Sequence, residues 1–202
     1  MDTTQLDKTH IHAGYIRRLW PADQALFRDH LLRLDTDSRH SRYGMAVSDE
    51  FLINYASQCF AHDSVIFGYF VDGVVRGAGE LRPLFEAHEL GKDRTAEAAF
   101  SVENEFRRKG VGTELLGRII RTARNRKASE LVMSCLASNR AMQTLAKHYR
   151  AEINFEADQV TGKLIGRAPN AFTRAQEAFE DSASFATAFV DLQKRLFSAA
   201  LH

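Results

Sequence analysis

The chain has 202 residues, of which 45% are hydrophobic and 26% charged, as expected of one sizeable globular domain. Its formal net charge of +1 gives no overall attraction to nucleic acid or to an acidic membrane, so neither is expected as a partner. The two cysteines, Cys59 and Cys135, form no C-x-x-C pair, which argues against a disulfide scaffold and against a zinc site.

The first ten residues are polar and contain no apolar signal region, and no long apolar run follows elsewhere. We therefore expect a cytoplasmic protein with no membrane-spanning segment. His10 and His12 could share a strand face, but no third candidate ligand is near them, so we expect no metal. Residues 13–20 predict a first strand.

Two helices are predicted next. Pro21 suits a first helical position, and residues 22–34 carry an apolar helical face. Asp49–Ala61 predicts a second helix with Ser48 as its N-cap. Residues 35–44, between them, are interpreted as a surface loop whose arginines pair with its own aspartates, with a substrate-facing loop as the alternative.

A hairpin follows these helices. Residues 64–70 and 74–81 are strand-like, and Asp72-Gly73 between them is a strong turn signal. Gly77 and Gly79 in the second strand indicate a bulge or a close approach of backbone.

The centre of the sequence is a strand at residues 96–102, then a turn rich in glycine and cations, then an amphipathic helix from Val111. The free amides and positive dipole of a helix N-terminus favour phosphate binding. Glu130–Leu136 is the next strand, so strand, helix and strand predict a parallel crossover.

The remaining chain predicts a helix opened by Asn139, a closing hairpin (residues 153–156 and 159–165) and a C-terminal helical extension. We divide the chain into a domain at residues 1–168 and an extension at residues 169–202, which is predicted to be one long amphipathic helix or two shorter ones, capped by Asn170. Apolar residues recur along that helix at steps of four and three, at Phe185, Phe189, Leu192, Leu196 and Ala199 with Phe172 and Phe179 upstream. This stripe either packs on the domain or forms a homodimer.

The glycine turn lacks the three-glycine spacing of a Rossmann fold and the Gly-Lys-Ser/Thr of a Walker loop. The pattern Arg107-x-x-Gly110-x-Gly112 resembles the Q/R-x-x-G-x-G/A signature of the GNAT N-acetyltransferase superfamily, and Asn139 resembles its second conserved helix start. The similarity covers residues 13–166. Residues 96–102 and 38–43 resemble, more narrowly, the acetyltransferase domain of bacterial protein-lysine acetyltransferases. The resemblance implies an α/β (α+β) fold with a mixed, mostly antiparallel central sheet flanked by helices.

The resemblance also implies acetyl-CoA as co-substrate. Its pantetheine would lie along a strand and its pyrophosphate on the amides of the turn. The residues expected to bind it are Phe100, Ser101, Val102, Arg107, Arg108, Lys109, Gly110, Val111, Gly112, Thr113 and Asn139. The basic run of Arg121, Arg124, Arg126 and Lys127 could meet the ribose phosphate, but a solvated face is the preferred interpretation.

Acetyl transfer to an amine needs a base. We assign this role to Glu97, a position where protein-lysine acetyltransferases carry a glutamate, and expect burial to raise its pKa. Glu80 on the neighbouring strand is the second candidate. The tyrosine that often protonates the leaving thiolate is absent, since Leu145-Ala146 stands at the matching pair, and Tyr149 is the substitute candidate.

The sequence therefore predicts an N-acetyltransferase that acts by direct transfer in a ternary complex, with a protein lysine or a small amine as acceptor. The alternative is a non-catalytic acyl-CoA-binding regulatory module. Residues 34–43 and 84–95 are expected to form the acceptor walls, because such pockets are built from variable loops.

Overall fold

A computed structural model describes residues 14–61, 64–83 and 94–200 of the chain. His10, His12 and most of the predicted acceptor segment 84–95 lie outside these ranges. Within them, no helix is long and apolar enough to cross a bilayer. The described part of the chain also contains no group of three or more His, Cys, Asp or Glu residues suited to a metal ion.

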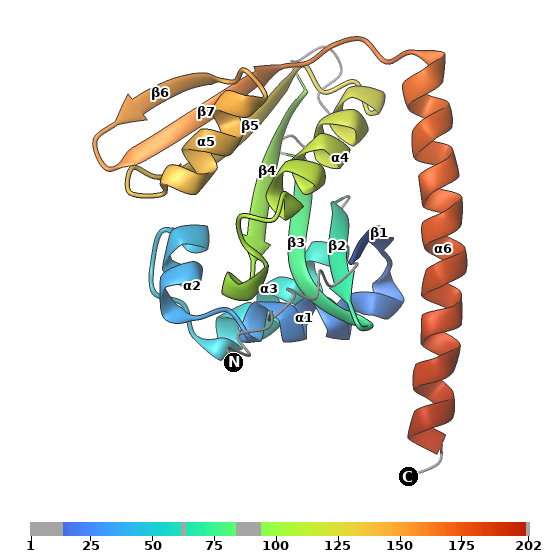
Figure 1. The fold of residues 1–202 in the computed structure, drawn as a ribbon. Helices are drawn as coiled ribbons and strands as arrows, with labels where there is room; N and C mark the ends of the chain where they lie inside the picture. The colour runs from blue at the N-terminus through green and yellow to red at the C-terminus, as the bar shows by residue number, and fades with distance from the viewer. Residues whose placement is uncertain (1–13, 62–63, 84–93, 201–202) are drawn as a thin grey trace, which may run out of the picture.

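The centre of the fold is a seven-stranded sheet in the order β1-β2-β3-β4-β5-β7-β6, in which only the β4–β5 pair is parallel (Figure 1). The predicted mixed and mostly antiparallel sheet is thus confirmed. The strands are β1 (Tyr15–Leu19), β2 (Val65–Val71), β3 (Val74–Pro83), β4 (Thr95–Val102), β5 (Glu130–Leu136), β6 (Glu152–Glu156) and β7 (Gln159–Ile165).

Each face of the sheet has its own apolar core. On one face, the stripe of α4 (Val111–Asn125) packs on β2, β3 and β4, and α5 (Arg140–His148) extends this core over β5 and β7. On the other face, α1 (Gln24–Leu32) and α3 (Asp49–Ala61) bury Phe27, Leu31 and Leu52 against Ile66 and Phe70. The α4 sequence forms a helix with one buried face because Leu115, Leu116 and Ile119 recur at helical spacing.

The β2–β3 hairpin turns at Asp72-Gly73 as predicted, and both residues have positive φ, which matches the strand twist. Both expectations for the glycines of β3 are also met. The register between β2 and β3 shifts beside Gly77, and a Cβ on Gly79 would lie only 3.0 Å from Ile119 Cδ1 of α4. Gly79 therefore allows α4 to sit close to the sheet.

The prediction of a loop at residues 35–44 was wrong, because this segment is the helix α2 (Thr36–Tyr43). Asp35 caps its N-terminus by accepting a hydrogen bond from the Ser38 amide, and Gly44 ends it in the left-handed region at φ 72°. Its arginines do not pair with its own aspartates: Arg39 reaches Asp49 and Arg42 reaches Glu80.

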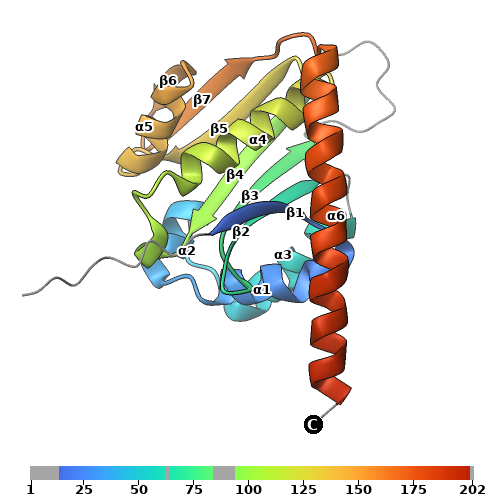
Figure 2. The ribbon, with the colours of Figure 1, turned by 45° about the vertical axis from the view of Figure 1, so that its right-hand side comes forward.

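The C-terminal helix α6 (Ala171–Ala200) is one continuous helix of 30 residues, capped by Asn170 as predicted. It runs beside the edge strand β1 and also contacts α4 (Figure 2). Short 3₁₀ turns, Pro21–Asp23 and Asn104–Phe106, precede α1 and the glycine turn.

Candidate active site

The glycine turn lies directly before the N-terminus of α4, as predicted. Gly110 is the N-cap of α4 at φ 82°, a conformation that L side chains rarely adopt, and Arg108 has φ 59°. Beyond it, the amides of Val111, Gly112 and Thr113 belong to the first helical turn and have no partner within the helix. A hypothetical Cβ on Gly110 would meet no atom within 4 Å, so the approach to the turn is open.

Arg107 differs from the other cations of this turn. Its Nε donates to the Val102 carbonyl oxygen at 2.9 Å and its Nη2 to the Ser38 hydroxyl at 2.7 Å. The Arg107 side chain thus fixes the turn to the end of β4 and to α2. Arg108 and Lys109 are exposed beside the turn.

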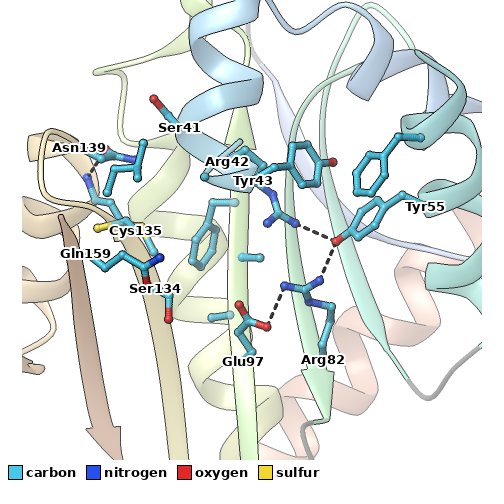
Figure 3. Close-up of a pocket in the computed structure, with 17 residues that line it drawn as sticks. Ser41, Arg42, Tyr43, Tyr55, Arg82, Glu97, Ser134, Cys135, Asn139 and Gln159 are labelled. Carbon is cyan, nitrogen blue, oxygen red and sulfur yellow. Dashed lines mark hydrogen bonds and ion pairs between the residues drawn. The ribbon is translucent and has the colours of Figure 1, made fainter. Parts of the chain in front are cut away.

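A gap opens inside the sheet beside this turn. Strands β4 and β5 pair only from Thr95↔Glu130 to Glu97↔Val132, and no further pair joins the two strands in the part of the chain that the structure describes. The gap belongs to a pocket of about 310 Å³. Its walls are formed by residues 97–100 of β4, residues 134–136 of β5, and Asn139 and Met142 at the start of α5. Arg82 and Gln159 also line it, together with residues of α2 and α3 (Figure 3).

Glu97 lies where the two strands separate, and its side chain faces the pocket (Figure 3). The side chain is 24% exposed, and Oε2 accepts a hydrogen bond from Arg82 Nη2 at 2.8 Å. Arg82 also donates to the Tyr55 hydroxyl at 3.1 Å. The expected surroundings of Glu97 were wrong in one respect, since an arginine, and not only apolar residues, contacts its carboxylate.

Glu80 occupies a different environment on the same face of the sheet. Its side chain is fully buried, and its carboxylate accepts hydrogen bonds from Arg42 at 2.6 Å and from the Tyr55 hydroxyl. Burial alone would raise the pKa of Glu80, but the charge of Arg42 and the Tyr55 hydrogen bond bring it below its usual range. Burial and the Glu80 charge raise the pKa of Tyr55, so its hydroxyl stays protonated and donates.

Tyr149, the substitute candidate for the thiolate acid, is not among the residues that line the pocket. Its hydroxyl donates to the Thr113 carbonyl oxygen at 2.8 Å, on the first turn of α4. Asn139 does line the pocket, and its side-chain oxygen caps α5 by accepting from the Met142 amide at 3.1 Å. Cys135 also lines it, but burial raises the pKa of its thiol, which disfavours a nucleophilic thiolate.

The outer end of β4 is fixed by a second buried polar cluster. Ser101 and Glu103 both contact the fully buried His30 of α1, whose Nε2 lies 2.9 Å from Ser101 Oγ and whose Nδ1 lies 3.1 Å from Glu103 Oε1. Burial lowers the pKa of His30. Burial would raise that of Glu103, but hydrogen bonds from His30 and Arg76 lower it to about 2. The cluster connects α1 to the strand that leads into the glycine turn.

The basic run on α4 has a structural role that the sequence did not indicate. Arg121 pairs with Glu180 of α6, and Arg124 Nε donates to the Ala168 carbonyl oxygen at 2.7 Å. These two arginines attach the C-terminal segment to the domain. They are therefore occupied, which argues against a role in binding ribose phosphate.

Three residues of the site were missed in the sequence: Arg42, Tyr55 and Arg82. Strand alternation could have found Arg82, because Glu80 and Arg82 lie two apart on β3 and therefore share a face. It also lies opposite Glu97 in the β3–β4 register. Arg42 and Tyr55 come from separate helices, and no local spacing signals that they meet Glu80.

The model of the acetyltransferase (GNAT) family matches residues 28–149, more than half of the chain. The chain belongs to the GNAT acetyltransferase family. This span contains Glu80, Glu97 and the glycine turn, while α6 lies outside it.

Solved structures show the same GNAT fold. The GNAT domain of S. lividans PAT is 18% identical with a TM-score of 0.65, over 75% of this chain and 90% of that one. The putative acetyltransferase yncA from Salmonella typhimurium, solved with acetyl-CoA, is 18% identical with a TM-score of 0.56, over 79% and 99%. The aminoglycoside N-acetyltransferase AAC(6')-Iy, solved with CoA, is 16% identical with a TM-score of 0.55, over 71% and 91%. No curated protein sequence matches the chain.

Proposed function

We propose that this GNAT protein is an acetyl-CoA-dependent N-acetyltransferase that acetylates a primary amine, with a protein lysine as the acceptor. The observation that carries the proposal is the position of Glu97. It lies where β4 and β5 separate, in a pocket continuous with the opened face of β4. Relatives solved with acetyl-CoA or CoA support the choice of co-substrate.

The residues present fit acetyl-CoA. The amides of Val111, Gly112 and Thr113 would hold the pyrophosphate, with Arg108 and Lys109 nearby. Backbone groups of β4 beyond Glu97 would hold the pantetheine amides, because β5 does not pair with them. When bound, acetyl-CoA supplies an acetyl group activated as a thioester.

Glu97 then acts as the general base. An alkylammonium has no free lone pair, so its proton must leave before the nitrogen can attack. Glu97 accepts this proton, and Arg82 holds the carboxylate towards the pocket. Glu80 is less suited to the task, because Arg42 and Tyr55 occupy its carboxylate and burial closes it to an acceptor.

The same geometry supports direct transfer from acetyl-CoA to the amine. Cys135 is the thiol in the pocket wall, and its raised pKa disfavours an acetylated enzyme. The Tyr149 hydroxyl donates a hydrogen bond to the Thr113 carbonyl oxygen, which disfavours Tyr149 as the acid that protonates the leaving thiolate. With Tyr149 and Cys135 set aside, solvent water is the proton source for the departing CoA thiolate.

The test is Glu97→Gln, which keeps the size of the side chain and removes the base. We expect kcat for release of free CoA thiol to fall about 10²- to 10⁴-fold, while calorimetry gives an unchanged Kd for acetyl-CoA. The acceptors assayed would be a library of lysine peptides with blocked N-termini and a panel of small amines, including amino sugars. Glu152→Gln, an exposed glutamate on β6, is the matched control and should retain full activity.

Equal turnover in wild type and Glu97→Gln would reject Glu97 as the base. Transfer to small amines but not to lysine peptides would show that the acceptor is a small amine and would reject a protein lysine. Binding of acetyl-CoA without acetylation of any acceptor in either panel would favour the non-catalytic regulatory module.

A further inference from the structure

The two faces of α6 have opposite chemistry. Towards the domain, the helix presents small and charged residues: Ser184 and Ala188 are buried, and acidic side chains pair with arginines of β1 and α4. These pairs are Asp181 with Arg18, Asp191 with Arg17, and Glu180 with both Arg118 and Arg121. The inner face thus attaches the helix by polar contacts and close packing.

The outer face of α6 is apolar and exposed, so Phe172, Phe179 and Phe197 do not pack on the domain, which was the first of the two expected roles. Among the described residues, seven of the thirteen exposed large apolar side chains lie on this one helix. The exposed fractions are 74% for Phe172, 76% for Phe179 and 71% for Phe197. So large an exposed apolar patch on a soluble protein marks an interaction surface.

The spacing along this outer face is the same in both chain directions. We define the outer stripe as Phe172, Phe179, Ala183, Ala186, Val190 and Phe197, all exposed. Successive members are 7, 4, 3, 4 and 7 residues apart, and at 100° per residue they fall within an arc of about 60°. Reversing the helix about the bond between Ser184 and Phe185 therefore superimposes large residues on large and alanine on alanine.

We infer that the outer stripe is the contact of a symmetric homodimer, in which the α6 helices of two copies pack antiparallel. An isologous contact requires a surface that is complementary to itself under a two-fold rotation, and this spacing meets that requirement. The two-fold axis passes at the level of Ser184 and Phe185. Ala183 and Ala186 lie at the crossing, where small side chains let the helices approach closely.

The register follows from the symmetry. Phe172 of each copy packs on Phe197 of the partner subunit, and Phe179 packs on Val190 of the partner subunit. The three phenylalanines of the outer stripe present on the order of 400 Å² of aromatic surface per copy, and Val190 and the two alanines add to it, so two copies can bury about 1,000 Å², near the low end of specific interfaces. A membrane is a poorer match for this face, because α6 carries four acidic residues and three basic ones, and anionic lipid favours basic helices.

The experiment measures the mass of the full-length protein by sedimentation velocity across micromolar concentrations. Wild type should sediment as twice the 22.8 kDa of the chain, and Phe179→Glu as a single chain. A charge inside an apolar contact lacks a partner, so the dimer dissociates. Arg174→Glu adds the same acid on the same helix, outside the outer stripe, and should remain a dimer.

A rescue variant tests the antiparallel register. Combining Phe179→Glu with Val190→Lys places the introduced carboxylate of one copy against the introduced ammonium of the other, and the dimer should return. Circular dichroism and acetyl-CoA binding should match wild type in every variant, which excludes unfolding as the cause of dissociation.

A monomeric wild type at 100 µM would overturn the proposal, as would a Phe179→Glu protein that stays dimeric. Cosedimentation of a monomeric wild type with vesicles of phosphatidylcholine and phosphatidylglycerol would also overturn it, and would assign the stripe to lipid. Failure of the rescue variant alone would reject the antiparallel register.

Discussion

Two acid–arginine pairs lie on the same face of the sheet, and they differ in access to solvent. Glu80 and Arg42 are almost completely enclosed, with 0% and 7% side-chain exposure, whereas Glu97 and Arg82 are 24% and 27% exposed. A carboxylate that must exchange protons with an incoming amine needs access. The enclosed pair is therefore suited to holding α2 against the sheet, and the open pair to chemistry.

This difference predicts separate consequences for two isosteric substitutions. Glu80→Gln removes the charge that compensates buried Arg42, and should reduce the free energy of unfolding by about 3 kcal/mol. Glu97→Gln breaks a more exposed pair and should reduce it by less than about 1 kcal/mol. Urea denaturation followed by tryptophan fluorescence would measure both.

The control for this prediction is Arg42→Met together with Glu80→Gln, which removes both charges at once. The double variant should be more stable than Glu80→Gln alone, because no uncompensated charge remains buried. If Glu80→Gln unfolds at the same urea concentration as wild type, the enclosed pair does not stabilise the attachment of α2.

Glu97 was named as a candidate base from the sequence, because protein-lysine acetyltransferases carry a glutamate at this place. Its arginine partner, Arg82, was not named. Glu80 was the second candidate because it lies on the neighbouring strand. What distinguishes the two is the contact of Glu80 with Arg42 of α2. These residues are 38 apart in sequence, and no local pattern encodes the contact.

At the scale of elements, two glycines beside or within α4 differ in what an added side chain would meet. Gly79 of β3 allows close packing, since an added Cβ would lie 3.0 Å from Ile119 Cδ1 and 3.3 Å from Leu115 Cβ. At Gly112 of α4 the nearest atom to an added Cβ is 3.7 Å away, which is ordinary contact. The first glycine serves the fold, and we expect the second to serve the ligand.

Alanine substitutions should separate these two tasks. Gly79→Ala should reduce the free energy of unfolding by about 1–3 kcal/mol through overpacking. Gly112→Ala should leave stability unchanged or slightly increased, because alanine favours helix, yet weaken acetyl-CoA binding roughly tenfold by keeping the pyrophosphate from the amides. Denaturation and calorimetry on both proteins would check this, and equal acetyl-CoA affinity in Gly112→Ala and wild type would count against the phosphate site.

Secondary structure was predictable wherever an apolar pattern matched the element. The ranges of α3 and β5 agree with their predictions to the residue, since both carry clear apolar patterns. Helix α2 was missed because it has only polar residues and one tyrosine, so it shows no apolar face. Its capping residues, Asp35 and Gly44, can be recognised in the sequence. The ion pairs that Arg39 and Arg42 make with other elements supply the remaining stabilisation of the helix.

At the scale of the whole molecule, acid should destabilise the fold through the His30 cluster. The folded pKa of His30 lies below its unfolded value of about 6.5, so the unfolded chain binds the proton first. The resulting loss of stability is small above about pH 7.5 and grows as pH falls through 6.5, by no more than about 1.4 kcal/mol for each pH unit. Glu103, with a pKa of about 2, adds a second loss between about pH 4.5 and 2.

The measurement is the free energy of unfolding at pH 7.5 and pH 5.5. The difference between the two should shrink in His30→Gln, which cannot take up a proton, whatever the stability of the variant at pH 7.5. His148→Gln changes an exposed histidine and should keep the wild-type difference. A wild-type difference that persists in His30→Gln would assign the acid sensitivity to other groups.

The separation of β4 from β5 also bears on how far sequences of this fold can diverge. The groove that we propose for the co-substrate is formed by main chain, because it consists of strand amides and carbonyls that β5 does not use. Main-chain groups are the same whichever side chains the strand carries. Natural selection would therefore have few residues to preserve here beyond the glycine turn and the proposed base, which fits a shared fold at only 18% identity with the S. lividans PAT domain.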